Sequence, residues 1–345
     1  MRNVHDLVEP ILNLHREMRD AVVTACERTA EAELARVDHD GVGDTIYAID
    51  RISEEQLIEA FEEKMTALGS VVLIAEGLPQ GGKVVLPHGT HEEEADWRVI
   101  VDPIDGTRGL MYQKRSAWIL TGVAPNRGAA TSLRDIVFAV QTEIPLVKQH
   151  LTDQIWAVRG ERVRATRLNR ITGEEHDIHL RPSAASSIAH GFATVARFFP
   201  GAREVLAAID DEMVAAVLGP VQPGKAHCFE DQYIATGGQL YELMVGHDRF
   251  VADLRPLTDL LFRDEGRALG LCCHPYDICT AMIAEALGVI LTAPDGSRLD
   301  VPLAVEPDVA WVGYANEALR AQVEPALQAA LRRRGLLEGQ GSRGG

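Results

Sequence analysis

Apolar residues near the N-terminus recur at the spacing of an α-helix. The pattern predicts one amphipathic helix over residues 3–35 and a second over residues 47–68. The apolar positions of the first are Leu7, Ile11, Leu14, Met18 and Val22. A polar stretch with two glycines, residues 38–43, is predicted to break the chain between the two helices.

After the second helix the pattern changes to short runs of apolar and β-branched residues, which are typical of strands. The first run ends at Glu76. Residues 77–94 are rich in glycine, proline and charge, so we expect a mobile loop there. Further strands are expected at about 98–102, 116–124, 135–143, 154–159 and 162–168. Their hairpin spacing favours antiparallel pairing.

The second half of the chain has a mixed pattern. It predicts a strand at 193–196, helices at 203–217 and 229–236, and then a helix at 278–287, strands at 289–292 and 310–314, and a helix at 316–331. No repeat and no linker divides the chain. We therefore predict a single domain over 1–335, with an α+β half at about 1–185, an α/β half at about 186–335, and a disordered tail at 336–345.

The charge of the chain limits its partners. A formal net charge of -17 argues against nucleic acid and against anionic membranes. No apolar run approaches the roughly 18 residues of a membrane helix, and the first residues have no apolar signal core. A cytoplasmic protein is expected. Five cysteines without paired spacing indicate reduced thiols and no zinc site.

One segment combines the residue types of a metal site and a phosphate site. An apolar run, 99–101, leads directly into Asp102-Pro103-Ile104-Asp105-Gly106-Thr107. Pro103 is expected to end the strand, which would leave two carboxylates and the Ile104 carbonyl as a cluster of hard oxygens. Mg²⁺ prefers such ligands. The backbone N–H groups of Gly106 and Thr107 suit a phosphate if a helix begins there.

Two further segments carry a resemblance. Upstream, the β-rich run 71–76 ends in Glu76; downstream, Asp277 begins an apolar helix that closes at Gly288. A strand ending in glutamate, then Asp-Pro-Ile-Asp-Gly-Thr, then an aromatic-Asp pair with a helix, resembles the inositol monophosphatase family. The resemblance covers residues from about 40 to 300. That family belongs to a wider group of metal-dependent, often lithium-sensitive sugar phosphatases.

The resemblance implies both a fold and an activity. The fold is an α+β layered α-β-α-β-α sandwich of the inositol monophosphatase and fructose-bisphosphatase type, with a large antiparallel sheet followed by a smaller mixed one. The activity is Mg²⁺-dependent hydrolysis of a phosphate monoester of a small polyol, sugar or nucleotide by a metal-activated water. The implied partner is this small phosphorylated substrate, and the family analogy allows a homodimer.

The resemblance also implies the metal ligands. Glu76, Asp102 and the carbonyl of Ile104 would hold a first Mg²⁺, and Asp102, Asp105 and Asp277 a second, with two or three ions in total. Crowded carboxylates raise one another's pKa unless a cation balances them, which agrees with this assignment. Taken singly, each acid is also a plausible turn former or helix cap.

A catalytic pair is implied as well. By the family analogy Asp50 hydrogen-bonds Thr107, and the two position the attacking water together with Glu76. The residues alone allow Asp50 to be an ordinary solvated acid on a helix. Tyr47 stands where the family often has threonine.

The substrate residues depart from the family. Gly77 replaces a second acid after Glu76, which leaves the number of metal ions open. The candidate substrate-binding residues are Arg108, Lys225, His227 and Glu242. An insertion at 247–275 is interpretable as a lid, a dimer contact or plain surface. The pattern leaves three alternatives: an inositol phosphatase, a phosphatase for a bisphosphorylated substrate (fructose 1,6-bisphosphate or 3′-phosphoadenosine 5′-phosphate), or a non-catalytic metal- or phosphate-binding relative.

Overall fold

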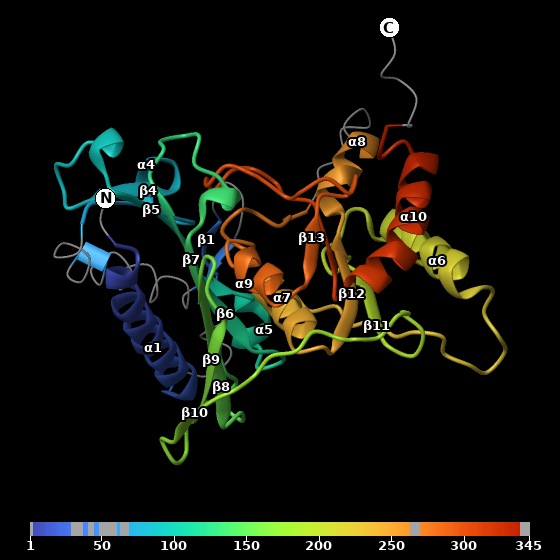
Figure 1. Ribbon diagram of the computed structural model, residues 1–345, viewed down its shortest axis with the longest axis horizontal. Coiled ribbons are helices and arrows are strands. Elements are labelled where there is room, and N and C mark those ends of the chain that lie inside the picture. The colour runs from blue at the N-terminus through green and yellow to red at the C-terminus, as the bar shows by residue number, and fades with distance from the viewer. Residues whose placement is uncertain are drawn as a thin grey trace, which may run out of the picture.

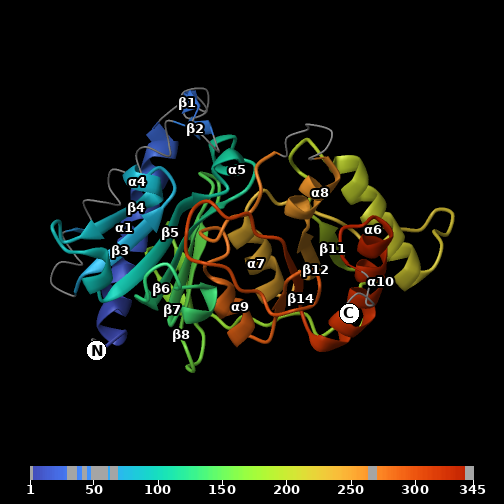
Figure 2. The same cartoon turned by 90° about the horizontal axis from the view of Figure 1, so that it is seen from above.

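The layers of the molecule alternate between helices and sheets (Figures 1 and 2). The computed structural model describes residues 3–28, 37–40, 45–47, 61–62, 69–262 and 270–338. Helix α1 covers one face of a large sheet, helices α7 and α9 lie between that sheet and a smaller one, and α6 and α10 cover the far face of the smaller sheet. The predicted α+β layered sandwich is confirmed.

The described helices range from one turn to 24 residues. The α-helices are α1 (His5–Arg28), α4 (Pro79–Gly82), α5 (Thr107–Met111), α6 (Arg203–Leu218), α7 (Thr236–Met244), α8 (Asp259–Phe262), α9 (Ala281–Ala286) and α10 (Glu317–Arg333). Short 3₁₀ helices are η1 (Glu92–Glu94), η2 (Leu133–Asp135) and η3 (Arg255–Thr258). Within the described part of the chain, no helix combines the length and apolar composition needed to cross a bilayer.

The large sheet has the strand order β10-β9-β8-β7-β6-β5-β3-β4. Its strands are β3 (Val71–Ala75), β4 (Lys83–Leu86), β5 (Trp97–Asp105), β6 (Ala117–Pro125), β7 (Phe138–Ile144), β8 (Leu151–Val158), β9 (Arg164–Asn169) and β10 (Glu175–Asp177). Neighbours from β5 to β10 pair antiparallel, as the hairpin spacing predicts. Strands β3 and β5 are parallel, because β4 and η1 lie between them in the chain.

The smaller sheet is mixed, with the order β11-β12-β14-β13. Its strands are β11 (Phe192–Val195), β12 (Asp248–Asp253), β13 (Ile290–Thr292) and β14 (Trp311–Tyr314), and the pair β11–β12 is parallel. A separate hairpin joins β1 (Val37–Asp40) and β2 (Thr45–Tyr47).

Strand β5 is buried on both faces. Val99 and Val101 pack in a core that includes Leu7 and Ile11 of α1, whereas Ile100 packs in the core that continues to the smaller sheet. Since successive side chains of a strand point to opposite faces, both faces must be apolar. This explains why the strand appears in the sequence as a continuous apolar run rather than an alternating one.

Several boundaries predicted from the sequence are wrong. The expected loop at 77–94 contains α4, η1 and β4, which pairs with β3. The expected helix at 229–236 is extended chain up to α7, because Phe229 exchanges backbone hydrogen bonds with Gly191 and Ala193 at the edge of β11. Pairing with that edge outweighs local helix propensity.

The other differences lie near the ends of the chain. Thr45–Tyr47 is a strand, so the helix predicted over 47–68 does not begin at Tyr47; the described residues 61–62 of that range are helical. Leu336 is buried in the core, so packed chain extends past the predicted boundary at 335. The remaining tail, 339–345, and Asp50 lie outside the described residues.

A buried histidine joins α1 to the large sheet. His15 is fully enclosed, with its ring nitrogens 2.8 Å from Thr121 Oγ1 and 3.0 Å from Thr142 Oγ1. Burial lowers the pKa of His15 from 6.5 to about 3, so the neutral ring belongs to the folded state.

This histidine should make stability depend on pH. Its folded pKa lies below its unfolded value, so its contribution is complete above pH 6.5 and is lost as the pH falls toward 3. The difference in unfolding free energy between wild type and His15→Gln should shrink by about 1.4 kcal/mol per pH unit below 6.5. Urea unfolding at pH 7.5 and pH 5.5 measures it, and an equal difference at both values would contradict this account.

Candidate metal centre

A β-bulge brings the two aspartates of the Asp-Pro-Ile-Asp segment to one face of the sheet. Asp102 lies opposite Leu120, and Asp105 lies opposite Trp118, so three steps along β5 match two along β6. In a regular strand, residues three apart point to opposite faces; the extra residue of a bulge cancels this difference. Strand β5 continues to Asp105. The prediction that Pro103 ends the strand is therefore wrong, and the proline lies within the bulged part.

Helix α7 is built against the carboxylate of Asp105. The backbone N–H groups of Thr236 and Gly237 donate to its two oxygens at 3.2 and 2.5 Å. These are the first residues of α7, whose N–H groups have no partner within the helix. A Cβ on Gly237 would lie 3.0 Å from Asp105 Oδ2 and 2.7 Å from a methyl of Leu120. Only glycine fits between the helix and the sheet at this point.

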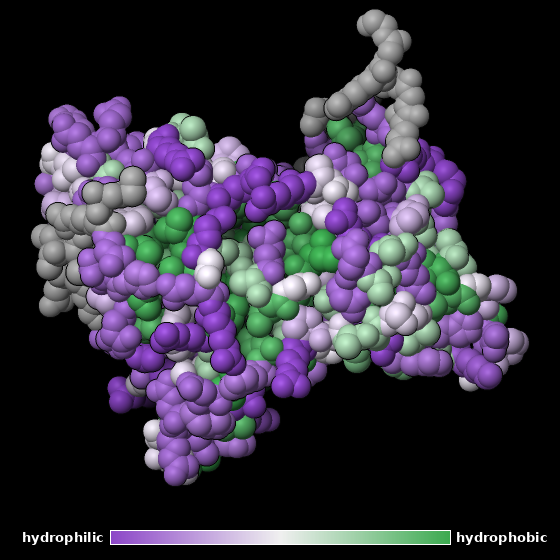
Figure 3. All heavy atoms as spheres, viewed as in Figure 1, coloured by the Kyte–Doolittle hydropathy of each residue, from purple (hydrophilic) through white to green (hydrophobic). Residues whose placement is uncertain are grey.

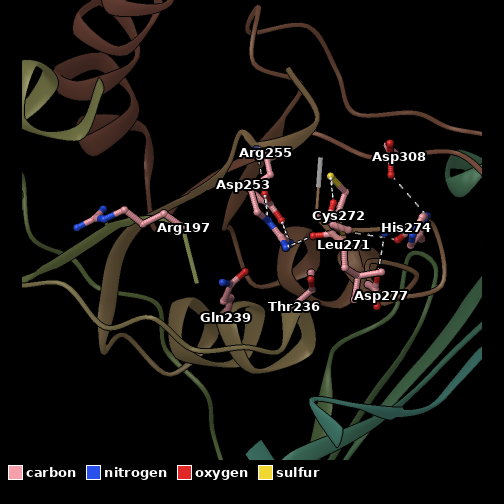
Figure 4. Close-up of polar contacts among 12 residues, drawn as sticks. Arg197, Thr236, Gln239, Asp253, Arg255, Leu271, Cys272, His274, Asp277 and Asp308 are labelled. Atoms are coloured by element: carbon pink, nitrogen blue, oxygen red, sulfur yellow. Dashed lines mark hydrogen bonds and ion pairs between the residues drawn. The ribbon is translucent and has the colours of Figure 1, made fainter. Parts of the chain in front are cut away.

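Asp277 reaches the same place from the second half of the chain. It precedes α9, and the backbone N–H of His274 donates to its Oδ2 at 2.6 Å (Figure 4). The ring of His274 stacks on Tyr276 with centroids 5.2 Å apart, and its Nδ1 lies 3.1 Å from the Pro307 carbonyl. The turn that carries Asp277 is thus fixed on two sides.

The three carboxylates form a compact group. One oxygen each of Asp102, Asp105 and Asp277 lies within 4.8 Å of the others. Burial, followed by the neighbouring carboxylates, raises the pKa of Asp102 well above its usual range, and Glu76 adds to this effect. Burial likewise raises the pKa of Asp105 and of Asp277. Full ionisation of such a group is unfavourable without a cation, and its hard oxygens suit Mg²⁺.

The turn after Asp105 is held by short-range contacts. Ile104 N–H donates to Asp102 Oδ1 at 3.0 Å, and the hydroxyl of Thr107 donates to the Ile104 carbonyl at 2.9 Å. Gly106 has φ +95°, and a Cβ there would lie 2.9 Å from Ala235 Cβ. Helix α5 then begins at Thr107. The predicted partner of Thr107, Asp50, lies outside the described residues.

The predicted substrate residues are spread more widely. The guanidinium of Arg108 lies 5.1 Å from the ring centroid of Phe199. Glu242 contacts His247 Nδ1 at 2.5 Å and lies 4.0 Å from the guanidinium of Arg115. Lys225 is exposed in a turn, and the carbonyl of His227 accepts a hydrogen bond from the backbone N–H of His190.

Sequence reasoning missed a buried arginine beside the site. Arg255 pairs through Nε and Nη2 with Asp253 at 2.8 and 2.5 Å, and its Nη1 donates to the Leu271 carbonyl at 2.5 Å. Its positive charge lowers the pKa of both Asp105 and Asp277 and so opposes the rise that burial causes. Asp253 is 0% and Arg255 7% exposed, so the interpretation of this part of the insertion as plain surface is wrong. The sequence signal that could have revealed this pair is an acidic and a basic residue, Asp253 and Arg255, two positions apart at the end of an apolar strand.

Comparison with known proteins gives a clear result for the fold. No protein-family model and no curated protein sequence matches the chain. Solved structures do. The extragenic suppressor protein SuhB from Bartonella henselae has a TM-score of 0.62 and 14% identity over 93% of this chain and 98% of its own. Fructose-1,6-bisphosphatase from Leishmania major has a TM-score of 0.66 and 14% identity over 95% and 94%.

A hypothetical protein from Pyrococcus horikoshii, with similarities to inositol-1 monophosphatase, matches with a TM-score of 0.60 and 14% identity over 94% of this chain and 99% of its own. The chain has the inositol monophosphatase and fructose-1,6-bisphosphatase fold. The resemblance inferred from the sequence is confirmed at this level. The TM-scores establish the fold, whereas an identity of 14% does not carry the reaction over to this chain.

The repulsion among Asp102, Asp105 and Asp277 should lower the stability of the metal-free protein. In EDTA, Asp102→Asn removes one of three mutually repelling carboxylates and should stabilise the protein by about 1–3 kcal/mol. Mg²⁺ should stabilise wild type by about 2.7 kcal/mol at one hundred times its Kd, and the variant by much less. Thermal unfolding with and without Mg²⁺ measures both effects. Asp177→Asn, at an exposed position on β10, is the matched control; a Mg²⁺ effect equal in Asp102→Asn and wild type would contradict the assignment.

Proposed function

We propose that this protein is a Mg²⁺-dependent phosphatase that hydrolyses a phosphate monoester of a small polyol, sugar or nucleotide. The observation that supports this most directly is the group of Asp102, Asp105 and Asp277, in which Asp105 lies just before the start of α5 at Thr107. The group requires positive charge, and the Gly106–Thr107 turn beside it offers backbone donors. A divalent cation and a phosphate are complementary to these two neighbouring features.

The donor set suits two ions. Following the resemblance, Glu76, Asp102 and the Ile104 carbonyl would hold one Mg²⁺, and the triad would hold the other. Bound Mg²⁺ supplies positive charge to the phosphoryl oxygens and lowers the pKa of a bound water. Asp105 is already oriented by two N–H groups of α7. A carboxylate fixed in this way needs little rearrangement when it binds a cation, which is the basis of electrostatic preorganisation.

The residues around the turn would bind and orient the substrate. The N–H groups of Gly106 and Thr107 would contact the phosphoryl group, and the Thr107 hydroxyl, with Asp50 as its proposed partner, would orient the attacking water. Catalysis in such a site is mainly positioning and electrostatic stabilisation. The chain is acidic overall, so the local cations Arg255 and Arg108 and the metal would have to reverse the field that an anionic substrate meets.

Arg108 keeps a bisphosphorylated substrate as a second candidate. It directly follows the proposed phosphate turn, and its guanidinium lies over Phe199 rather than in open solvent. An arginine held beside one phosphate site can contact a second anionic group with its planar fork of donors.

Phosphate release from a panel of monoesters tests the proposal. The panel includes inositol monophosphates, fructose 1,6-bisphosphate and 3′-phosphoadenosine 5′-phosphate, each with Mg²⁺ and with EDTA. We expect Mg²⁺-dependent release that falls at least about 100-fold in Asp102→Asn and in Thr107→Ala, with Asp177→Asn unchanged. In Arg108→Met a bisphosphate should lose more activity than a monophosphate. Release that persists in EDTA, or Mg²⁺ binding without turnover of any compound, would contradict the enzymatic proposal.

A further inference from the structure

A second pocket is lined by none of the three carboxylates of the metal centre. It is bordered by η2, by the turn after β8, by the first residues of α9 and by the loop between β13 and β14. The pocket is a shallow depression that opens to solvent: its enclosed volume is about 20 Å³, and the wider space of about 370 Å³ above its residues includes open solvent. Its floor is apolar and includes Ile136, Ala281 and Leu299. The face drawn in Figure 3 shows apolar surface between hydrophilic side chains over this part of the molecule.

Three arginines from separate segments line this pocket together with one glutamate, Glu285. Arg134 belongs to η2, Arg159 follows β8, and Arg298 lies between β13 and β14; all three side chains are exposed. Burial raises the pKa of Glu285, at the end of α9. The positive charge of each of the three arginines lowers it. All three arginines and Glu285 line the same pocket, so their charges share one small region of the surface.

The positive charge of this pocket is not fully neutralised. Among the residues that the structure describes, none of the three guanidiniums forms an ion pair, whereas neighbouring Arg127 pairs with Asp135 at 2.6 Å. A second acid, Asp300, contacts only the backbone N–H of Arg134, at 3.3 Å. Three cations thus stand against two carboxylates, in a chain whose net charge is -17.

One of the arginines is also held in place. Arg159 donates through Nε to the Ile136 carbonyl and through Nη2 to the Arg134 carbonyl, both at 2.9 Å. These bonds fix its guanidinium at the border of the pocket. A positioned guanidinium can bind a tetrahedral oxyanion without the entropy cost that a free side chain carries.

We propose that this pocket is a binding site for a phosphate-type dianion, either inorganic phosphate or the phosphoryl group of a small metabolite, separate from the metal centre. The guanidiniums of Arg134, Arg159 and Arg298 bind the oxyanion, and the apolar floor contacts any attached carbon skeleton. Cys279 and Ala281 line the pocket two and four residues after Asp277. An occupant therefore contacts the segment that carries one of the triad carboxylates.

The two anion sites can be separated by their need for metal. At the metal centre, crowded carboxylates repel phosphate unless cations are bound. At the arginine pocket no metal is needed. A calorimetric titration of the full-length protein with inorganic phosphate in EDTA therefore measures binding at the pocket alone. This holds whether or not the metal centre is catalytic.

We expect one phosphate to bind in EDTA. Arg134→Ala/Arg298→Ala should weaken binding at least about tenfold, because it removes two of three charge-assisted contacts. Arg162→Ala/Arg164→Ala is the matched control, since both residues are exposed, lie close by in sequence and do not line the pocket; its affinity should stay within about twofold. Glu285→Gln should tighten binding about three- to tenfold, because it removes a like charge from the pocket. A folding defect would weaken phosphate binding, so tighter binding in Glu285→Gln cannot come from misfolding.

Other outcomes would overturn the proposal. These are the absence of phosphate binding in EDTA, an equal affinity in the pocket variant and its control, or weaker binding in Glu285→Gln. Asp102→Asn should leave phosphate binding in EDTA unchanged. If that variant changes the affinity instead, the phosphate is bound at the metal centre and the pocket is not the site.

Discussion

The repulsion among Asp102, Asp105 and Asp277 is the constraint on which this structure depends. One oxygen of each lies within 4.8 Å of the others, with Asp102 and Asp105 buried and Asp277 half-buried, and this crowding is unfavourable without a cation. Three separate elements nevertheless bring them together: a bulge in β5, the first turn of α7, and the turn before α9. Since β5 and α9 belong to different halves of the chain, the carboxylates join the two halves. The halves meet where a bound metal would stabilise both.

The neighbouring polar groups compensate part of this cost. Two N–H groups of α7 bind the Asp105 carboxylate, which satisfies donors that would otherwise lack partners. Arg255 adds a buried positive charge, and Asp253 and the Leu271 carbonyl hold it in place. A buried ion pair contributes little net stability, but it fixes the position of β12 against the chain that leads to Asp277. The site is therefore organised in advance of any ligand.

Much of this arrangement could be predicted from the sequence, and the failures have physical causes. Strands β5 to β9 were recognisable because strands buried on one or both faces are rich in apolar residues. The bulge was not recognisable from the sequence, because a proline normally ends a strand. Here the pairing with β6 continues past Pro103 to Asp105. The extended chain at 229–235 depends on pairing with β11, a contact distant in sequence. Arg255 was missed because its importance comes from the fold around it. The residue types of the motif suit a metal and a phosphate, whereas the rest of a substrate would be selected by pocket residues that no motif marks.

The most direct test of the account is to locate the metal. Crystals grown with Mn²⁺ in place of Mg²⁺ would be measured for anomalous scattering, since Mn²⁺ accepts the same oxygen ligands. The account predicts a peak between the carboxylates of Asp102, Asp105 and Asp277, at about 2.0–2.3 Å from an oxygen of each, and no such peak in Asp102→Asn. The absence of a peak in wild type at saturating Mn²⁺, with the three carboxylates still together, would contradict the claim that a cation holds this site.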